Sequence, residues 1–253
     1  MVISIRMLIM KGTKSYFDMH GHYHAYHKNP DFYSPLINYI RKSAFHSNGK
    51  MRVFDLGCGD GSFIQAFIKA GISADYIGSD ISQVMINMAK QNLDYHRIGL
   101  FVADGFKLPL QPQTKFDIIH IDSVLHHLIE ITRSKSWRLS NKMLDLLVSM
   151  LFVNGILIVE EYYYDSYIIP HITSSIVFYG LKLLKFLRLD ISKIMTDCKP
   201  GLEVNFFYEK QLCDALKHYG TVQRIKKRPD KLSKLQRVFL AKDIGHVSYI
   251  LKV

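Results

Sequence analysis

Apolar residues along this chain fall into two alternating patterns, short continuous runs and segments with helical spacing. Short runs that end in turn residues indicate buried strands, whereas apolar residues three or four positions apart indicate helices. Because the two patterns alternate, they predict an α/β fold: a doubly wound, mostly parallel sheet with helices on both faces. The runs that predict strands are one that begins at Met51, then Tyr76–Asp80, Leu100–Ala103, Phe116–Asp122 and Ile156–Glu160.

Helices are predicted before, between and after these strands. They are Pro35–Ala44, a helix that ends at Gly71, a helix that Ser82 caps, Met143–Leu151, and Glu209–Tyr219 with Gly220 behind it. Two further strands with a basic connection, Thr221–Lys226 and Arg237–Lys242, are predicted to follow the last helix.

A long connection separates the fifth strand from that last helix. Glu161–Phe207 far exceeds an average loop, so we expect a helical insertion after strand five. Within it, Ile172–Leu189 is an apolar helix with a basic edge. Three interpretations remain open: a lid over the substrate, an interfacial helix on anionic lipid, and a helix packed on the core or in a dimer contact.

Charge and cysteine content narrow the class of protein. The 253 residues carry a formal net charge of +11, which favours an anionic partner such as RNA or a membrane surface, or reflects a basic background without a binding role. Three cysteines without paired spacing predict no disulfide framework, no zinc site and a reducing, cytoplasmic compartment. No apolar stretch reaches the length of a spanning helix, and the N-terminus lacks the features of a signal peptide.

Histidines and aromatic residues crowd the segment from Tyr16 to His27. No cysteine or firm carboxylate cluster completes a metal site around these histidines, so we predict no bound metal. We expect a mobile cover over an active site, with a surface loop as the alternative.

Three glycines at alternate positions, Gly57, Gly59 and Gly61, follow the first strand and precede a helix. Glycine permits a sharp turn and lets a ligand approach the backbone, and the free N–H groups of the helix N-terminus attract an anionic group. The third glycine comes one place too early for the dinucleotide fingerprint, which disfavours a nicotinamide-dependent oxidoreductase. The loop predicts a nucleotide-type cofactor.

The motif Asp55-x-Gly57-x-Gly59-x-Gly61 resembles the first motif of the class I S-adenosylmethionine (SAM)-dependent methyltransferases. Later landmarks of that family recur in order: Asp80 after the second strand, Asp104 after the third, and Phe116–His120 leading into Val124–Leu128. The resemblance covers Met51–Gly155 well. It implies a seven-stranded sheet with an antiparallel last strand, SAM as cofactor and S-adenosylhomocysteine (SAH) as product. It also implies a cover over residues 1–45 and a SAM-binding domain over 46–253, with 161–207 interpreted as its lid.

The resemblance also implies a cofactor site. The loop Gly57-Cys58-Gly59-Asp60-Gly61 would hold the methionyl part of SAM, and Asp55 would orient that loop or reach the amino group through water. Asp80 would accept hydrogen bonds from the ribose hydroxyls, with Ile81 against the adenine ring. Asp104 would accept from the adenine amino group, with main-chain contacts from Ala103 and Gly105. Asp122 and Ser123 would lie beside the transferring methyl group.

Two neighbouring histidines, His126 and His127, are candidates for the catalytic base, with a structural or cofactor-lining role as the alternative. The end of the fifth strand is expected at the mouth of the pocket, where Glu160, Glu161 and Tyr162–Tyr164 would contact the acceptor or only pack at its rim.

The favoured function is methyl transfer to oxygen or carbon of a small-molecule or lipid-like acceptor. Relatives that look closest methylate quinones, isoprenoids and other hydroxylated metabolites. An RNA methyltransferase is a second hypothesis, supported by a basic C-terminal patch consisting of Arg224, Lys226, Lys227, Arg228, Lys231, Lys234 and Arg237. A third is a SAM-binding subunit without catalysis. The expected location is cytoplasmic, with peripheral membrane association as a second option.

Overall fold

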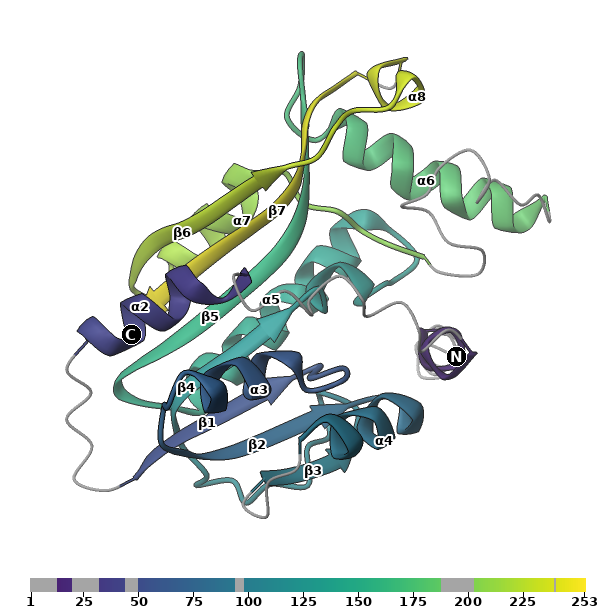
Figure 1. The fold of residues 1–253 in the computed structure, drawn as a ribbon. Helices are drawn as coiled ribbons and strands as arrows, with labels where there is room; N and C mark the ends of the chain where they lie inside the picture. Colours follow the sequence, from purple (N-terminus) through teal and green to yellow (C-terminus); the bar gives the residue numbers. More distant parts are fainter. Residues whose placement is uncertain (1–12, 20–31, 44–49, 94–97, 188–202, 239) are drawn as a thin grey trace.

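One seven-stranded sheet organises the computed structural model, which describes residues 13–19, 32–43, 50–93, 98–187, 203–238 and 240–253. Its strands lie in the order β3-β2-β1-β4-β5-β7-β6. The first five strands pair in parallel, and β7 runs antiparallel to both β5 and β6 (Figure 1). The strands are β1 (Met51–Leu56), β2 (Ala74–Asp80), β3 (Ile98–Val102), β4 (Phe116–Asp122), β5 (Leu151–Ser166), β6 (Thr221–Pro229) and β7 (Ala241–Lys252). The predicted fold class is confirmed.

Helices cover both faces of the sheet (Figure 1). They are α2 (Ser34–Lys42), α3 (Ser62–Lys69), α4 (Gln83–Asn92), α5 (Arg133–Ser149), α6 (Ile172–Phe186), α7 (Glu209–Lys217) and α8 (Lys234–Val238), with a 3-10 turn, η3 (Leu125–His127). Residues 13–19 add a short helix before α2. Helices α2, α3 and α4 share one apolar cluster with one face of the sheet, and α5 and α7 share a second cluster with the other. The sheet is therefore buried on both sides, as its continuous apolar runs predict.

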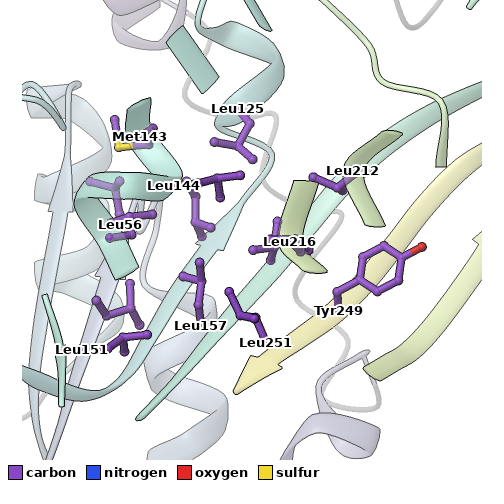
Figure 2. Close-up of a cluster of buried hydrophobic side chains, with 14 of the residues drawn as sticks. Leu56, Leu125, Met143, Leu144, Leu151, Leu157, Leu212, Leu216, Tyr249 and Leu251 are labelled. Carbon is purple, nitrogen blue, oxygen red and sulfur yellow. The ribbon is translucent and has the colours of Figure 1, made fainter. Parts of the chain in front are cut away.

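The core beneath α5 and α7 explains why these two helices pack side by side along the sheet. Met143 and Leu144 of α5 and Leu212 and Leu216 of α7 are each no more than 1% exposed. Figure 2 shows them in one cluster with Leu157 of β5 and Leu251 of β7. This packing fixes the C-terminal strands relative to the parallel half of the sheet.

Strand β5 is much longer than predicted. It starts at Leu151, where a helix was expected to end, and continues past Glu160 to Ser166 because β7 provides a partner along that whole length. The expected Asn-Gly turn lies inside the strand as an irregularity: Asn154 has a φ of 66°, and the pairing with β4 shifts register nearby. Helix α5 correspondingly begins at Arg133, with Thr132 as its N-cap, and not at Met143.

The prediction of a strand over Arg237–Lys242 is wrong. Residues 234–238 form α8, and the strand starts at Ala241. Ser233 and Gln236 explain the difference, because the backbone N–H of each residue donates to the side chain of the other, at 2.7 and 3.2 Å. This reciprocal pair is a capping box, a helix-start signal that is legible in the sequence.

The insertion after β5 contains one described helix, α6, which begins at Ile172 as predicted. Residues 161–166 of the expected insertion belong to the sheet, and the predicted C-terminal end of the helix at Leu189 lies outside the described residues. Over the described part of the chain, no helix is both long enough and apolar enough to cross a bilayer.

Candidate active site

The glycine loop joins β1 to α3 through three left-handed residues. Gly57, Gly59 and Gly61 have φ values of 74°, 53° and 80°, a region that side chains with a Cβ rarely adopt. The loop is also fixed to the neighbouring strand, because the N–H groups of Gly57 and Cys58 both donate to the carbonyl of Ser79. These contacts present the turn at the carboxyl end of the sheet, with the start of α3 behind it.

Asp80 connects the glycine loop to the next helix. The backbone N–H of Gly59 donates to its Oδ2 at 3.1 Å, and the N–H of Ser82 donates to its Oδ1 at 2.8 Å. Burial raises the pKa of Asp80 to about 6, although these N–H groups favour the ionised form. The predicted ribose acceptor thus also orders the loop that precedes it.

The predicted cofactor residues after the third strand begin beside Asp80. The N–H of Ala103 donates to the carbonyl of Asp80, which brings the two strand ends together. Asp104 accepts from the N–H of Phe106 through Oδ1, and Gly105 packs close to Met143 of α5. Ile81, between Asp80 and the cap of α4, is half-buried.

The end of β4 lies directly against the glycine loop. A Cβ built on Gly57 would stand 2.3 Å from Cγ2 of Val124, so only glycine fits at this approach. Asp122 and Ser123 precede Val124: the Ser123 hydroxyl donates to the Asp122 carboxylate, and the Ser123 N–H donates to the backbone carbonyl of Glu160 on β5. The structure therefore brings the predicted methyl-side residues next to the predicted cofactor loop.

Asp55 has a partner that the motif alone did not indicate. Its Oδ1 lies 2.7 Å from Nδ1 of His120 on β4, and Nε2 of His120 lies 3.9 Å from Glu160. Phe63 of α3 stacks on the His120 ring at 3.8 Å. Burial alone would lower the pKa of His120, but the two carboxylates raise it to about 10, so the imidazole is charged.

Two buried acid oxygens keep a free hydrogen-bonding capacity near the loop. Oδ2 of Asp55 and Oδ2 of Asp60 have no hydrogen-bond partner within the described part of the chain. Buried polar atoms of this kind suit a ligand that donates hydrogen bonds, and SAM carries an ammonium group. With the glycine cradle and Asp80, this donor-acceptor set fits SAM.

Cys58 contributes its backbone to the loop, whereas its side chain is a packing element. It is 6% exposed, and a Cβ on Gly78 of β2 would lie 3.0 Å from its sulfur. Burial raises the pKa of its thiol well above the usual range, so the group is inert at neutral pH.

His126 forms a buried pair with Glu161 of β5. Its Nδ1 lies 2.7 Å from Oε2 of Glu161, and the backbone N–H of Leu125 donates to Oε1 at 2.8 Å. The N–H of Asn205 donates to the His126 carbonyl, which fixes the backbone of the turn. This His–carboxylate arrangement was not predicted, because sequence spacing could not align residues on β5 with η3.

Burial favours the uncharged forms of both members of this pair. It raises the pKa of Glu161 to about 8 and lowers that of His126 to about 4. Near neutral pH the pair is therefore net neutral. One proton is shared between Nδ1 and Oε2, and the ring carries its own proton on Nε2. When the His126–Glu161 pair loses one proton, Glu161 becomes a carboxylate that accepts from Nδ1–H, and Nε2 becomes a proton acceptor.

His127 lies at the inner surface of the N-terminal helix, residues 13–19. Phe17 meets its ring edge-on at 5.5 Å, and the His126 ring lies 4.0 Å from it. Burial lowers the pKa of His127 well below its usual range, which keeps it neutral. The same short helix reaches the cofactor side, because the Ser82 hydroxyl donates to Asp18 Oδ1 at 2.5 Å.

The residues expected at the mouth of the pocket, Glu160, Glu161 and Tyr162–Tyr164, lie within β5. Glu160 and Glu161 are 3% and 0% exposed, and Tyr163 and Tyr164 are fully buried. The reason is the length of β5: these residues pair with β7 in the middle of the strand, not at its end. Inside the protein, Glu160 lies near His120, the partner of Asp55, and Glu161 pairs with His126.

Among the described residues no group of three metal-ligating side chains comes together. The histidines at positions 20, 22, 24 and 27 lie outside the described residues, so the structure places none of them.

The basic C-terminal patch divides into separate groups. Arg224 and Lys227 both bind Glu209 at 2.6 Å, whereas Lys226 and Arg228 lie over the ring of Phe32 next to α2. The other three basic residues belong to the α8 region: Lys231, Lys234 and Arg237. The set is not one continuous phosphate-tracking surface.

Known proteins share both sequence and fold with this chain. A family model described as a methyltransferase domain matches residues 47–235, well over half of its length. The mRNA cap guanine-N(7) methyltransferase of Schizosaccharomyces pombe is 36% identical over 101 residues, which is 36% of this chain and 28% of that protein. A ubiquinone biosynthesis O-methyltransferase of Rhodopseudomonas palustris is 29% identical over 109 residues, 39% of this chain and 42% of that protein. The chain thus matches less than half the length of both relatives.

Solved structures extend the likeness over almost the whole chain. The magnesium protoporphyrin IX methyltransferase from Synechocystis, solved with bound SAH, superposes with a TM-score of 0.55 at 16% identity, covering 96% of this chain and 99% of that one. An arsenic(III) SAM methyltransferase from Chlamydomonas reinhardtii gives 0.54 at 15% identity, covering 79% and 63%. These similarities show a common fold. With the matching family model and the glycine loop, Asp80 and Asp104 assembled at one edge of the sheet, they establish that the chain belongs to the class I SAM-dependent methyltransferases.

Proposed function

We propose that this chain transfers the methyl group of SAM to an oxygen or carbon atom of a small-molecule or lipid-like acceptor, with His126 as the base. The observation that carries the proposal is the buried His126–Glu161 pair at the end of β4. His126 of this pair follows Val124 by two residues, and Val124 contacts Gly57 of the glycine loop. A proton acceptor with its own buried carboxylate is the arrangement that deprotonates a weakly acidic nucleophile.

Bound SAM would supply a methyl group on a positively charged sulfur. The glycine loop and Asp80 would hold the donor, and Nε2 of His126 would take the proton from the acceptor hydroxyl or activated carbon as the new bond to methyl forms. The bond from methyl to sulfur breaks in the same displacement, and SAH and the methylated acceptor are the products. Glu161 pairs with Nδ1 of the ring, so that Nε2 can accept a proton once the pair has lost one.

Aromatic and aliphatic side chains around the pair favour an apolar acceptor. Phe206 lies 5.4 Å from the His126 ring and stacks on Tyr164, and Phe17 covers His127. Tyr16 and Val177 belong to the same apolar cluster. The surroundings offer a dry site, which suits a small ring or isoprenoid-like group better than a charged nucleic acid.

The first experiment transfers radiolabelled methyl from SAM into a cell extract of the source organism, followed by separation into organic, aqueous, RNA and protein fractions. Label in the organic or small-molecule fraction is the expected result. Label in RNA would replace the proposed acceptor, an outcome that the similarity to the mRNA cap methyltransferase makes worth testing. SAH binding without any label would support a non-catalytic SAM-binding subunit.

The base is tested by His126→Asn, which keeps a donor near Glu161 but removes Nε2. We expect the transfer rate to fall roughly 10²- to 10⁴-fold while SAH affinity stays within about twofold, because the loop and Asp80 are intact. A matched control is His218→Asn on the exposed end of α7, which should change neither quantity. A normal rate in His126→Asn would refute the assignment.

A further inference from the structure

Helix α6 has two apolar sides that point in opposite directions. One side is anchored to the domain: Val177 and Phe178 are at most 6% exposed, and Arg133 of α5 donates to Ser174 at 2.7 Å. The hydroxyl of Ser166 on β5 also donates to that of Thr173 at 2.6 Å. Because this side is fixed against the protein, the opposite side faces outward.

The outward side is a continuous apolar stripe, which we call the α6 stripe. Its members recur at helical spacing, and they are Ile176, Tyr179, Leu183, Phe186 and Leu187, between 37% and 82% exposed. The turn that precedes the helix continues it, because Tyr167, Ile168 and Ile169 are 67%, 71% and 44% exposed. Contiguous apolar residues of this kind mark an interaction surface.

Basic residues of the α8 region lie beside the stripe, and Asp165, Asp230 and Asp243 border the two chain segments that form this surface. Residues 166–187 and 231–242 contain no aspartate or glutamate. The two segments adjoin, since the N–H of Tyr167 donates to the carbonyl of Leu240 at 3.1 Å, and both α6 and α8 lie at the end of the sheet where β5 ends (Figure 1). The exposed cations of the second segment are Lys231, Lys234, Arg237 and Lys242, and Val238 between them is 72% exposed.

The cations on α6 itself are already partnered. Lys182 and Lys185 both bind Glu203, and Lys182 also lies 4.9 Å from the centre of the Phe178 ring. They keep the edge of the helix polar. The surface as a whole therefore combines exposed apolar residues with a positive rim.

We propose that the α6 stripe, the turn 167–169 and the α8 region form a docking surface for a membrane that contains anionic phospholipid. Apolar side chains would enter the interface between headgroups and acyl chains, while the cations of α8 would meet the phosphates. Charge complementarity favours this occupant: a second copy would bring two positive rims together, and RNA would leave the apolar stripe exposed. The proposal does not depend on catalysis.

The test is flotation of the whole protein with vesicles of phosphatidylcholine alone and of phosphatidylcholine mixed with phosphatidylglycerol. We expect binding to the mixed vesicles that weakens as salt is raised, and much less binding to phosphatidylcholine alone. Leu183→Asn combined with Phe186→Asn should reduce the affinity for mixed vesicles roughly tenfold or more. Lys234→Glu combined with Arg237→Glu should reduce it at least about 30-fold, because each lost cation weakens attraction to the anionic surface.

Val153→Asn is the matched control, because Val153 is 90% exposed at the opposite end of β5 and should not affect binding. Thermal melting confirms that each variant is folded. Equal binding to both vesicle types, no binding to either, or wild-type binding by the Leu183/Phe186 variant would each overturn the proposal. So would a dimer in sedimentation that the Leu183/Phe186 variant converts to monomer, which would make a second copy the occupant.

Discussion

His120 and Asp55, which are 65 positions apart in the chain, face each other across neighbouring strands with Nδ1 and Oδ1 at 2.7 Å. Asp55 stands two residues before the first glycine of the cofactor loop. The pair is covered by Phe63 from the helix that follows the loop. The acid of the first motif thus has a structural partner beside the glycine loop, as well as one oxygen that has no hydrogen-bond partner among the described residues.

His120→Gln should destabilise the protein strongly, because it leaves the carboxylates of Asp55 and Glu160 buried without a cation. We expect the free energy of unfolding to fall by about 3–5 kcal/mol in urea titration. Asp55→Asn in the same chain should recover part of this loss, since it removes one of the uncompensated charges. A loss below about 1 kcal/mol for His120→Gln would show that the pair is not ionic.

Asp80 should make cofactor affinity depend on pH. Its pKa of about 6 means that the carboxylate is ionised above that value and becomes protonated below it, where it accepts fewer hydrogen bonds. Calorimetry with SAH should therefore show affinity that falls as pH is lowered through about 6. Asp80→Asn should weaken binding by about 1–3 kcal/mol and remove the Asp80-dependent part of this pH dependence. A variant that binds SAH as tightly as the wild type would refute the ribose-binding role.

Gly57→Ala should disrupt the junction between the cofactor loop and the end of β4. The new methyl group would stand 2.3 Å from Val124 in a left-handed backbone, so the loop or the η3 turn must move. We expect SAH affinity to fall at least about tenfold, measured by calorimetry. Gly71→Ala is the control for backbone strain alone, because Gly71 has a φ of 75° with no atom within 4 Å of the added Cβ. It should lower stability but leave SAH affinity unchanged.

The His126–Glu161 pair should make the rate of methyl transfer depend on pH. The base-competent form appears only when the pair loses a proton, and the pKa of Glu161 is about 8, so the rate should rise with pH up to about 8 and then level off. Rates of single turnover across this range measure the effect. The glutamine of Glu161→Gln cannot become a carboxylate. The rate of this variant should therefore not rise with pH and should stay low at all pH values. An unchanged profile in that variant would remove Glu161 from the mechanism.

The contact between Asp18 and Ser82 should slow cofactor release. It joins the N-terminal helix to the start of α4, two residues after the predicted ribose acceptor. Asp18→Ala removes one charge-assisted hydrogen bond, so SAH should dissociate about tenfold faster in stopped-flow measurements. Lys14→Ala, which removes the ion pair to Asp18 but not the Ser82 contact, is the control and should change the rate less. Equal rates in wild type and Asp18→Ala would show that the N-terminal helix does not cover the cofactor.

The sequence by itself determined the parallel half of the sheet and the glycine loop that follows its first strand. Apolar runs such as Phe116–Asp122 and the helical spacing after Gly61 are local patterns, and local patterns fix element type. Glycines that need positive φ carry their meaning locally, so the turn at Gly57 could be placed without coordinates, and the family resemblance placed Asp80 and Asp104 after their strands.

Only the tertiary structure decided which distant side chains meet. The extension of β5 to Ser166 depends on pairing with β7, and it places Glu161, expected at the mouth of the pocket, as the buried partner of His126. The same holds for His120 with Asp55 and for Phe17 with His127, whose sequence separations exclude any local signal. Strand register and burial set these contacts, and with them the pKa values that the proposed chemistry requires.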